Sequence, residues 1–307
     1  MHFKIAQLGG APNRPNGGLW VTSLLGSNLK ETGLTRYDAI GMQYNSYRNA
    51  DARIVSILKE LLGLPEGAVV VDVGAGTGNY SNALAASGYQ LKAIEPSEVM
   101  RNQSVPSLNV EWLAGSAESI PLPEASAGGL ISILAVHHFP DLVAAAAEMR
   151  RVCGNGPMVL FTIDPRRGEP FWFREYFPGI YGRLFDAFVP VEELMSAFTR
   201  NHDVTATVRG FSLPHDLSDL NMHAGWNRPE VYLDPVARRG MSGFAMADPS
   251  EVTAGLDLLG RDLELGEWEN RNGYLRMKES YDLGFIFVKI QLRSRSCLDK
   301  WAKQTGG

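Results

Sequence analysis

Hydrophobic positions in the first half of the chain alternate between helical and strand-like spacing. From Asp51 an apolar stripe keeps the spacing of one helix face, and Gly63 is a typical C-terminal cap for that helix. A short β-branched run at 68–73 then breaks at a cluster of glycines, after which 80–86 has helical spacing up to Gly88. The pattern predicts a helix, a strand buried on both faces, a glycine turn and a second helix.

The same alternation continues to the middle of the chain. Further strands are predicted at 90–94, 109–113, 129–135 and 157–163. Ser97 and Asp141 begin helices between strands, because their side chains can accept hydrogen bonds from the free N–H groups of a helix start. Strands and helices that alternate at this length predict an α/β fold with a doubly wound, mostly parallel sheet.

The pattern changes after Asp164. Residues 170–188 contain eight aromatic side chains, which is typical of a cover over the sheet rather than of another strand and helix. Strands near 204–211 and 283–290 are predicted to complete the sheet as an antiparallel C-terminal hairpin pair. The segment between them, 212–278, is then a mixed, largely helical insertion.

These elements predict one domain over 36–307, preceded by a loosely ordered leader over 1–35. The leader has little charge and many Gly, Asn and Pro residues, and it lacks the basic-then-apolar order of a secretion signal. The substrate cap is expected to comprise two segments, about 166–200 and 212–278.

Composition and charge narrow the class of protein. With 45% hydrophobic residues, the 307-residue chain can form a large core. A net charge of -5 does not suggest the clustered basic residues that hold a phosphate backbone. No apolar run approaches the roughly 20 residues of a membrane span, and Cys153 and Cys297 follow no metal-ligand spacing. We therefore expect a globular cytoplasmic protein with no metal, membrane partner or nucleic-acid partner.

The glycine cluster and the acid that follows the next strand carry the first chemical signal. Gly74, Gly76 and Gly78 let the backbone approach a ligand closely, and the following helix directs N–H groups toward an anionic group. Dinucleotide binders favour Gly-x-Gly-x-x-Gly, so the tighter spacing favours another cofactor. Glu95 is placed to accept both hydroxyl protons of a ribose. The alternative is that Glu95 is a solvated loop acid.

Four motifs in order, at 71–78, 94–97, 115–121 and 135–141, resemble those of small-molecule class I S-adenosylmethionine (SAM) dependent methyltransferases. The first is Val-Asp-Val-Gly-Ala-Gly-Thr-Gly and the last is Ala-Val-His-His-Phe-Pro-Asp. The chain most resembles the branch of the ubiquinone and menaquinone biosynthesis methyltransferases, the methyltransferase type 11 family, over about residues 36–165. The resemblance implies a Rossmann-like, seven-stranded sheet that binds SAM over its first two strands.

The resemblance implies cofactor contacts position by position. The implied residues are Tyr44, Arg48, Gly74, Ala75, Gly76, Thr77, Gly78, Glu95, Pro96, Met100, Ser116, Ala117, Glu118, Ala135 and Val136. The glycine turn would hold the methionine part, Glu95 the ribose and residues 116–118 the adenine edge, although an Asp is common in the family at Ser116. Arg48 would pair with the SAM carboxylate. The alternative is that Tyr44 and Arg48 belong to an ordinary amphipathic surface.

Methyl transfer from a sulfonium is an in-line displacement, so the protein mainly aligns the nucleophile and excludes water. Some nucleophiles also need a general base. His137 and His138 are the candidates, because they follow the fourth strand at the edge where open α/β sheets bind ligands. His137 is the preferred base, and the alternative is that the pair packs against the cofactor.

Aromatic side chains of the insertion would form an apolar roof for a flat or prenyl-like substrate. The predicted substrate contacts are Trp172, Tyr176, Tyr181, His215 and Trp226. The alternative is a satellite core beneath the insertion. Four arginines could instead recognise a carboxylate or phosphate: Arg166, Arg167, Arg174 and Arg228. His223 is, with His215, a weaker candidate for a base or substrate contact.

The predicted function is SAM-dependent methyl transfer to a small-molecule acceptor in secondary or cofactor metabolism. One alternative is a methyltransferase that acts on RNA or protein. Another is a protein that binds SAM or S-adenosylhomocysteine (SAH) without methyl transfer, because a fold does not establish a reaction. A nicotinamide oxidoreductase is a distant third. No motif specifies the oligomeric state.

Overall fold

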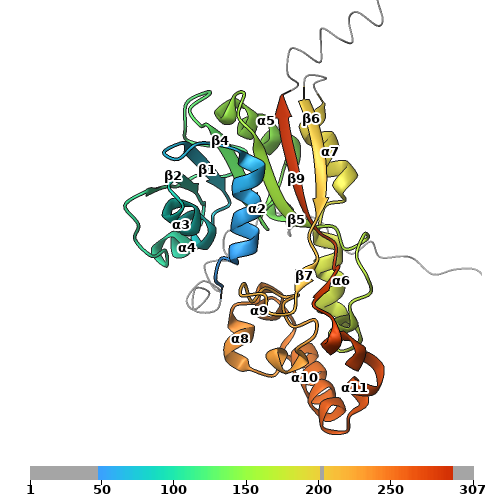
Figure 1. The fold of residues 1–307 in the computed structure, drawn as a ribbon. Coiled ribbons are helices and arrows are strands. Elements are labelled where there is room, and N and C mark those ends of the chain that lie inside the picture. Colours follow the sequence, from blue (N-terminus) through green and yellow to red (C-terminus); the bar gives the residue numbers. More distant parts are fainter. Residues whose placement is uncertain (1–47, 201–203, 293–307) are drawn as a thin grey trace, which may run out of the picture.

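The computed structural model describes residues 48–200 and 204–292. The leader expected over 1–35 and the predicted cofactor residue Tyr44 lie outside these ranges. The described part contains a seven-stranded sheet in the order β3-β2-β1-β4-β5-β9-β6 (Figure 1). Its strands are β1 (Val69–Val73), β2 (Gln90–Ile94), β3 (Val110–Leu113), β4 (Gly129–Ile133), β5 (Met158–Ile163), β6 (Val204–Gly210) and β9 (Phe285–Leu292).

The strand directions confirm the predicted fold class. Strands β1 to β5 are parallel to one another, and β9 is antiparallel to both β5 and β6. The last two strands pair directly, with Val204 opposite Leu292. They do not form a tight hairpin, because residues 211–284 leave the sheet between them. The sheet is therefore doubly wound, Rossmann-like and mostly parallel, and β9 is the antiparallel strand.

β1 lies where the strand order reverses. β2 pairs with one edge of β1 and β4 with the other. Val70, Val71 and Val73 of β1 are fully buried, as expected for a strand covered on both faces. Such a reversal leaves a crevice at the carboxyl ends of the strands. The residues that follow β1, β2 and β4 therefore face the usual ligand site of this architecture.

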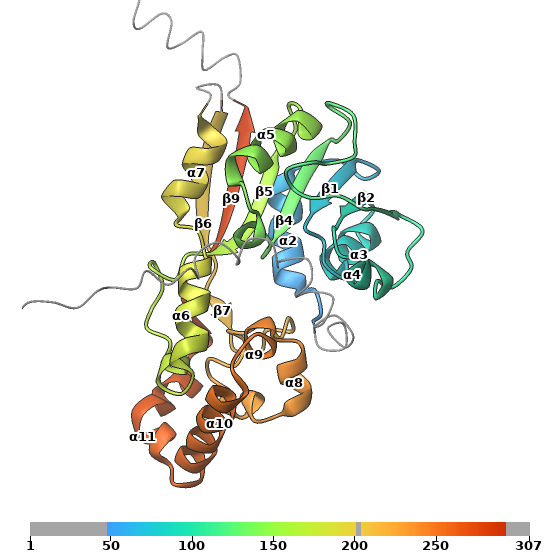
Figure 2. The ribbon, with the colours of Figure 1, turned by 180° about the vertical axis from the view of Figure 1, so that it is seen from behind.

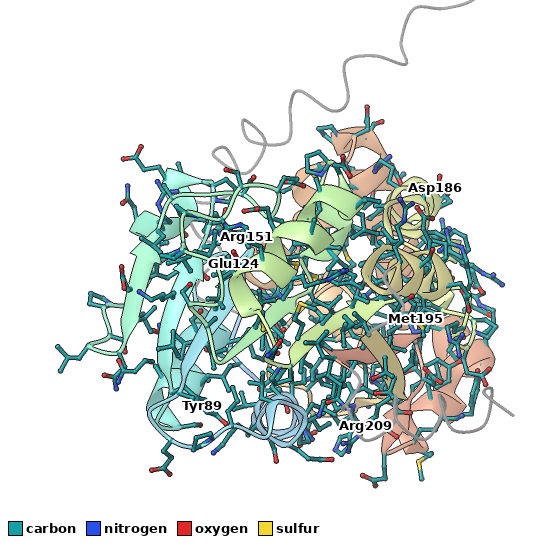
Figure 3. The ribbon with its side chains drawn as sticks, turned by 90° about the horizontal axis from the view of Figure 1, so that it is seen from above. Tyr89, Glu124, Arg151, Asp186, Met195 and Arg209 are labelled. Atoms are coloured by element: carbon teal, nitrogen blue, oxygen red, sulfur yellow. The ribbon has the colours of Figure 1, made fainter. Side chains whose placement is uncertain are left out.

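Helices cover both faces of the sheet. They are α2 (Ala52–Leu62), α3 (Asn79–Ala86), α4 (Glu98–Asn102), α5 (Leu142–Cys153) and α7 (Val191–Thr199). Leu58 of α2 shares a core with Ile131 on one face, and Met149 of α5 shares a core with Leu160 on the other. Figure 3 shows α5, which carries Arg151, and α2 on opposite sides of the sheet. Within the described ranges, no helix is long and apolar enough to cross a bilayer.

The predicted helix ends are those observed. The Asp51 carboxylate accepts from the N–H of Arg53 at the start of α2, and Gly63 ends that helix with a left-handed φ of 61°. The Ser97 hydroxyl accepts from the N–H of Met100 in α4. These caps fix where α2 and α4 begin beside the carboxyl edge of the sheet.

A cap, formed by residues 170–188 and 211–284, lies beyond one end of the sheet (Figures 1 and 2). Its elements are the short helix Trp172–Glu175, α6 (Pro178–Ala187), β7 (Leu213–Pro214), Pro229–Tyr232, α8 (Pro235–Arg239), α9 (Ser242–Ala245), α10 (Pro249–Glu264), α11 (Glu267–Asn272), Gly273–Met277 and β8 (Ser280–Tyr281). The first expected cap segment, 166–200, also includes α7, which packs against α5 on the sheet instead. The division of the whole chain into a leader and one domain stays a prediction.

The cap has an aromatic core of its own. Phe173 stacks on Phe177 with 4.6 Å between ring centroids, and Trp172 meets Trp268 edge-on at 5.3 Å. All four rings are buried, as is Tyr232. Burying one large apolar side chain contributes about 1.5 to 3 kcal/mol, so these rings stabilise the cap, and they are continuous with the core on one face of the sheet.

Gly284 lies where the chain returns from the cap into β9. Its N–H donates to Asp282 Oδ1 at 2.9 Å. Its carbonyl accepts from the N–H of Asp164, also at 2.9 Å. Its φ is 81°, and an added Cβ would lie 2.2 Å from the Asp164 carbonyl oxygen. A side chain at this position is therefore both strained and obstructed by backbone.

Gly284→Ala is predicted to lower the free energy of unfolding by about 1 to 3 kcal/mol, measured by denaturant titration. Gly266→Ala is the matched control, because Gly266 also has a positive φ, 73°, but nothing lies within 4 Å of its added Cβ. The loss should be clearly larger at Gly284. Equal losses would contradict the close packing at this crossing.

Candidate active site

The turn after β1 needs glycine at each of its three positions. Gly74, Gly76 and Gly78 have φ values of 75°, 58° and 80°, the left-handed region that disfavours other residues. A Cβ at Gly74 would lie 2.6 Å from Ala135 Cβ, and one at Gly78 would lie 2.5 Å from Trp112. The missing side chain at Gly74 therefore lets Ala135, just after β4, lie close to the turn. At Gly78 it makes room for Trp112 of β3.

Glu95, at the end of β2, is joined directly to this turn. Its Oε2 accepts from the N–H of Gly76 at 2.9 Å, and its Oε1 accepts from the N–H of Ser97 at 3.0 Å. The side chain is buried, and burial raises its pKa although both backbone bonds oppose the rise. Each oxygen retains a lone pair for a ligand hydroxyl. Glu95 is thus not a solvated loop acid, and its ribose contact stays a prediction.

Asp72 in β1 is a site residue that sequence reasoning did not select. Its Oδ2 accepts from the Ser81 hydroxyl at 2.6 Å. Its Oδ1 is buried and has no hydrogen-bond partner among the described residues. Burial, with a further contribution from the charge of Glu95, raises the pKa of Asp72 to about 7. The signal was present in the first motif, as an acid that directly precedes the glycine turn.

A cavity of about 520 Å³ lies at the carboxyl edge of the sheet, beneath the cap. Predicted site residues that line it are Arg48, Gly74, Ala75, Gly76, Thr77, Glu95, Pro96, Met100, Ser116, Ala117, Glu118, Ala135, His137 and His138. Gly78 and Val136 do not line it, since Gly78 faces Trp112 and Val136 is buried in the core beneath α5. The structure thus brings together most of the predicted cofactor residues and both histidines.

His137 and His138 form a short helix, Val136–His138, directly after β4. Their ring centroids are 3.8 Å apart, and the His137 ring lies 4.4 Å from that of Phe188. Nδ1 of His137 is buried without a partner among the described residues. Burial lowers the pKa of His137 well below its usual value, with a smaller effect from His138, and burial lowers the pKa of His138 to about 4. Both imidazoles are therefore neutral at pH 7.

Arg48 lines the cavity but is engaged by the cap. Its guanidinium forms an ion pair with Asp219, which is nearly fully buried. The Tyr80 hydroxyl donates to the same carboxylate at 3.2 Å. The predicted pairing of Arg48 with the SAM carboxylate would therefore have to share the guanidinium with Asp219.

None of the five predicted substrate residues lines the cavity. Trp172 and Trp226 are buried in the cap core, where Trp172 Nε1 donates to the Trp226 carbonyl at 2.7 Å. The Tyr176 hydroxyl donates to Asp262 at 3.0 Å, the Tyr181 ring lies near Phe185, and His215 is exposed beside Glu279. Trp172, Tyr176 and Trp226 thus lie in the satellite core that was the alternative, and Tyr181 packs against it. The substrate contacts stay a prediction.

None of the four arginines proposed for an anionic substrate lines the cavity, Arg174 included. Arg166 bonds to the Phe188 carbonyl, Arg167 pairs with Glu192, and Arg228 bonds to the Ala224 carbonyl. Residues from the cap and its borders that do line the cavity are Leu184, Phe188, Asp219, Asn221, Met222, His223, Met241 and Ser242. Of these lining residues, the sequence analysis selected only His223. It missed the others because no motif indicates which cap residues lie against the carboxyl edge of the sheet.

Comparison with known proteins identifies methyltransferases among the relatives of this chain. A family model described as a methyltransferase domain matches residues 71–161. A crystal structure from Anabaena variabilis ATCC 29413, named as a candidate methyltransferase from an antibiotic biosynthesis pathway, is 42% identical in sequence. That match covers 81% of this chain and 100% of the other, with a TM-score of 0.79.

Two further relatives are more distant. Malonyl-[acyl-carrier protein] O-methyltransferase from Yersinia pestis is 31% identical over 169 residues, which are 53% of this chain and 60% of the relative. The chain thus spans about 60% of the length of the curated relatives it matches. Phosphoethanolamine N-methyltransferase 2 from Haemonchus contortus, solved with SAM, is 14% identical, with 86% of this chain and 57% of that chain covered and a TM-score of 0.54. That likeness concerns the fold alone.

Glu95→Ala is predicted to weaken SAH binding by roughly 1 to 3 kcal/mol, because two charge-assisted hydrogen bonds to the ribose would be lost. Isothermal titration measures the affinity directly. Glu111→Ala is a suitable control, since Glu111 is an exposed acid that pairs with Lys92 and does not line the cavity. An unchanged affinity in Glu95→Ala would contradict the ribose assignment.

The free energy of unfolding is predicted to fall between pH 7 and pH 5, in part through His223. Burial lowers the pKa of His223 to about 4 in the folded protein, whereas an unfolded histidine titrates near 6.5. The unfolded state therefore binds more protons between these values, so stability is lost as pH falls. His223→Phe should reduce that loss by on the order of 1 to 2 kcal/mol in denaturant titrations. An identical pH dependence in both proteins would contradict a buried, neutral His223.

Proposed function

Because the chain belongs to the class I SAM-dependent methyltransferases, we propose that it transfers the methyl group of SAM to a small-molecule acceptor held beneath the cap. One observation carries this proposal. A single cavity is lined by Gly76 and Glu95 from the sheet and by His137, His223 and other cap-facing residues. Cofactor and acceptor can therefore meet inside one cavity.

SAM is the cofactor of this family, and the residues at the sheet end of the cavity fit it. Gly76 has no side chain that would block the turn, and Glu95 holds a buried, anchored carboxylate for the ribose hydroxyls. Met100 and Ala117 supply buried apolar surface beside it for the adenine. When bound, SAM supplies a methyl group on a sulfonium that is already activated for displacement. The protein's remaining task is to place the acceptor.

His137 and His138 would orient the acceptor's nucleophile. They follow β4 and line the cavity, and Nδ1 of the neutral His137 ring, which has no partner among the described residues, can accept a hydrogen bond from a hydroxyl or amine. With its pKa lowered to about 4, His138 is a weak base at pH 7. We therefore assign the pair to alignment of the nucleophile, with transfer of its proton to an imidazole only as the new bond forms.

The walls around the histidines would exclude water. Apolar residues that line this part of the cavity are Ile133, Leu134, Ile163, Leu184, Phe188, Met222 and Met241. A dry, apolar surrounding favours an organic acceptor and protects the reaction from competing hydrolysis.

The relatives bear on the acceptor without defining it. The Anabaena protein is named for an antibiotic biosynthesis pathway, which favours an acceptor of secondary metabolism. The Yersinia relative acts on a malonyl group carried by a protein, so a carrier-bound acyl group is the second candidate. A net charge of -5 disfavours RNA.

The test is to incubate the purified protein with methyl-labelled SAM and extract of the source cells, and then to separate small molecules from macromolecules. We predict label in the small-molecule fraction. Label in RNA or in proteins other than a carrier would contradict the proposal. Label that is released from a carrier protein by thioester cleavage would support the acyl-group candidate instead.

A further inference from the structure

Charge is distributed unevenly around the cavity. Asp72 lies in β1, Glu95 follows β2 directly, and Glu118 lies in the loop after β3, so all three come from the sheet end. The remaining charged lining residues, Arg48 and Asp219, form an ion pair with each other. Among the described residues that line the part beneath the cap, no group is thus available to neutralise a charged acceptor.

A histidine from the cap occupies this uncharged part. The His223 ring stacks on Phe171, with 5.2 Å between centroids and an interplanar angle of 25°, and meets Phe285 edge-on at 5.3 Å. Its backbone N–H donates to Asn221 Oδ1 at 2.9 Å, which fixes the loop that carries it. The ring orientation is therefore set by packing on two aromatic side chains.

The two nitrogens of the His223 ring make no hydrogen bond to another described residue. His223 is 6% exposed and lines the cavity, yet neither ring nitrogen is hydrogen-bonded within the described chain. Neither nitrogen is among the fully buried polar atoms that lack a partner, so both are open to the cavity. An apolar ring would fill the same space between Phe171 and Phe285, so the accessible imidazole nitrogens point to a ligand.

The three cavity histidines do not indicate a metal. Within the described ranges, no group of three or more His, Cys, Asp or Glu side chains is arranged to hold a metal ion. His137 and His138 come from the sheet and His223 from the cap, so the imidazoles border the space in which an acceptor would lie.

We propose that His223 is an acceptor-binding residue and that the acceptor is an uncharged molecule with a hydroxyl or carbonyl group that hydrogen-bonds to it. This inference rests on the proposed function, because it assumes that the acceptor lies beneath the cap. The proposed acceptor therefore differs in charge from acceptors that carry a free carboxylate or phosphate. Such a group would need a cation, and the Arg48 guanidinium is already held by Asp219.

The first experiment tests the acceptor's charge. Small molecules from the source cells are divided at pH 7 by anion- and cation-exchange resins into anionic, cationic and neutral pools. Each pool is incubated with the full chain and methyl-labelled SAM. Label in the neutral pool is expected, and label confined to a charged pool would overturn the inference while leaving the proposed function intact. No label in any pool would overturn both.

The second experiment tests His223 with the labelled acceptor, once it is purified. His223→Phe keeps the ring packing but removes both nitrogens, so the KM for the acceptor should rise about tenfold or more. SAH affinity, measured by titration, should change less than about twofold, which also verifies the fold. His223→Gln should recover part of the loss. His215→Gln is the control, since His215 lies outside the cavity. An unchanged acceptor KM in His223→Phe would overturn the assignment.

Discussion

The hydrogen bond from the Gly76 N–H to the Glu95 carboxylate, 2.9 Å long, ties together the two loops that follow the central strands. A buried carboxylate is costly unless hydrogen bonds compensate for lost water, and Glu95 receives such bonds from Gly76 and Ser97. The same contact fixes the turn that leads into α3. The position of the turn, the carboxylate and the start of α4 thus depends on one small network.

The cap completes the site from the opposite side. Its aromatic core is continuous with the core on one face of the sheet, and the loop that carries Asp219 and His223 lies over the sheet edge. Asp51 accepts from the backbone and hydroxyl of Ser218, and Arg48 pairs with Asp219. These contacts hold the loop against the sheet domain. With the proposed function, the cavity would combine a cofactor end built on strands with an acceptor end built on a loop, the usual place for variation in specificity.

The cofactor end could be predicted from sequence because its signals are local. Alternating periodicity located the strands, and glycine spacing located a turn whose positive φ values admit little else. Glu95 followed from its place one strand later. The acceptor end could not be predicted in the same way. Trp172 and Trp226 were predicted to contact the substrate because aromatic density does not distinguish a roof from a core, and the structure buries both in the cap. His223 contributes to the cavity only through tertiary contacts with Phe171 and Phe285, which no sequence spacing reveals.

A crystal structure of the full chain with SAH tests the central claim most directly, because the claim is that one cavity serves both cofactor and acceptor. The account predicts that SAH lies along the glycine turn, with its ribose hydroxyls within hydrogen-bond distance of Glu95 and with free space left between its sulfur and His223. SAH bound elsewhere, or SAH that fills the space beneath the cap as far as His223, would contradict it.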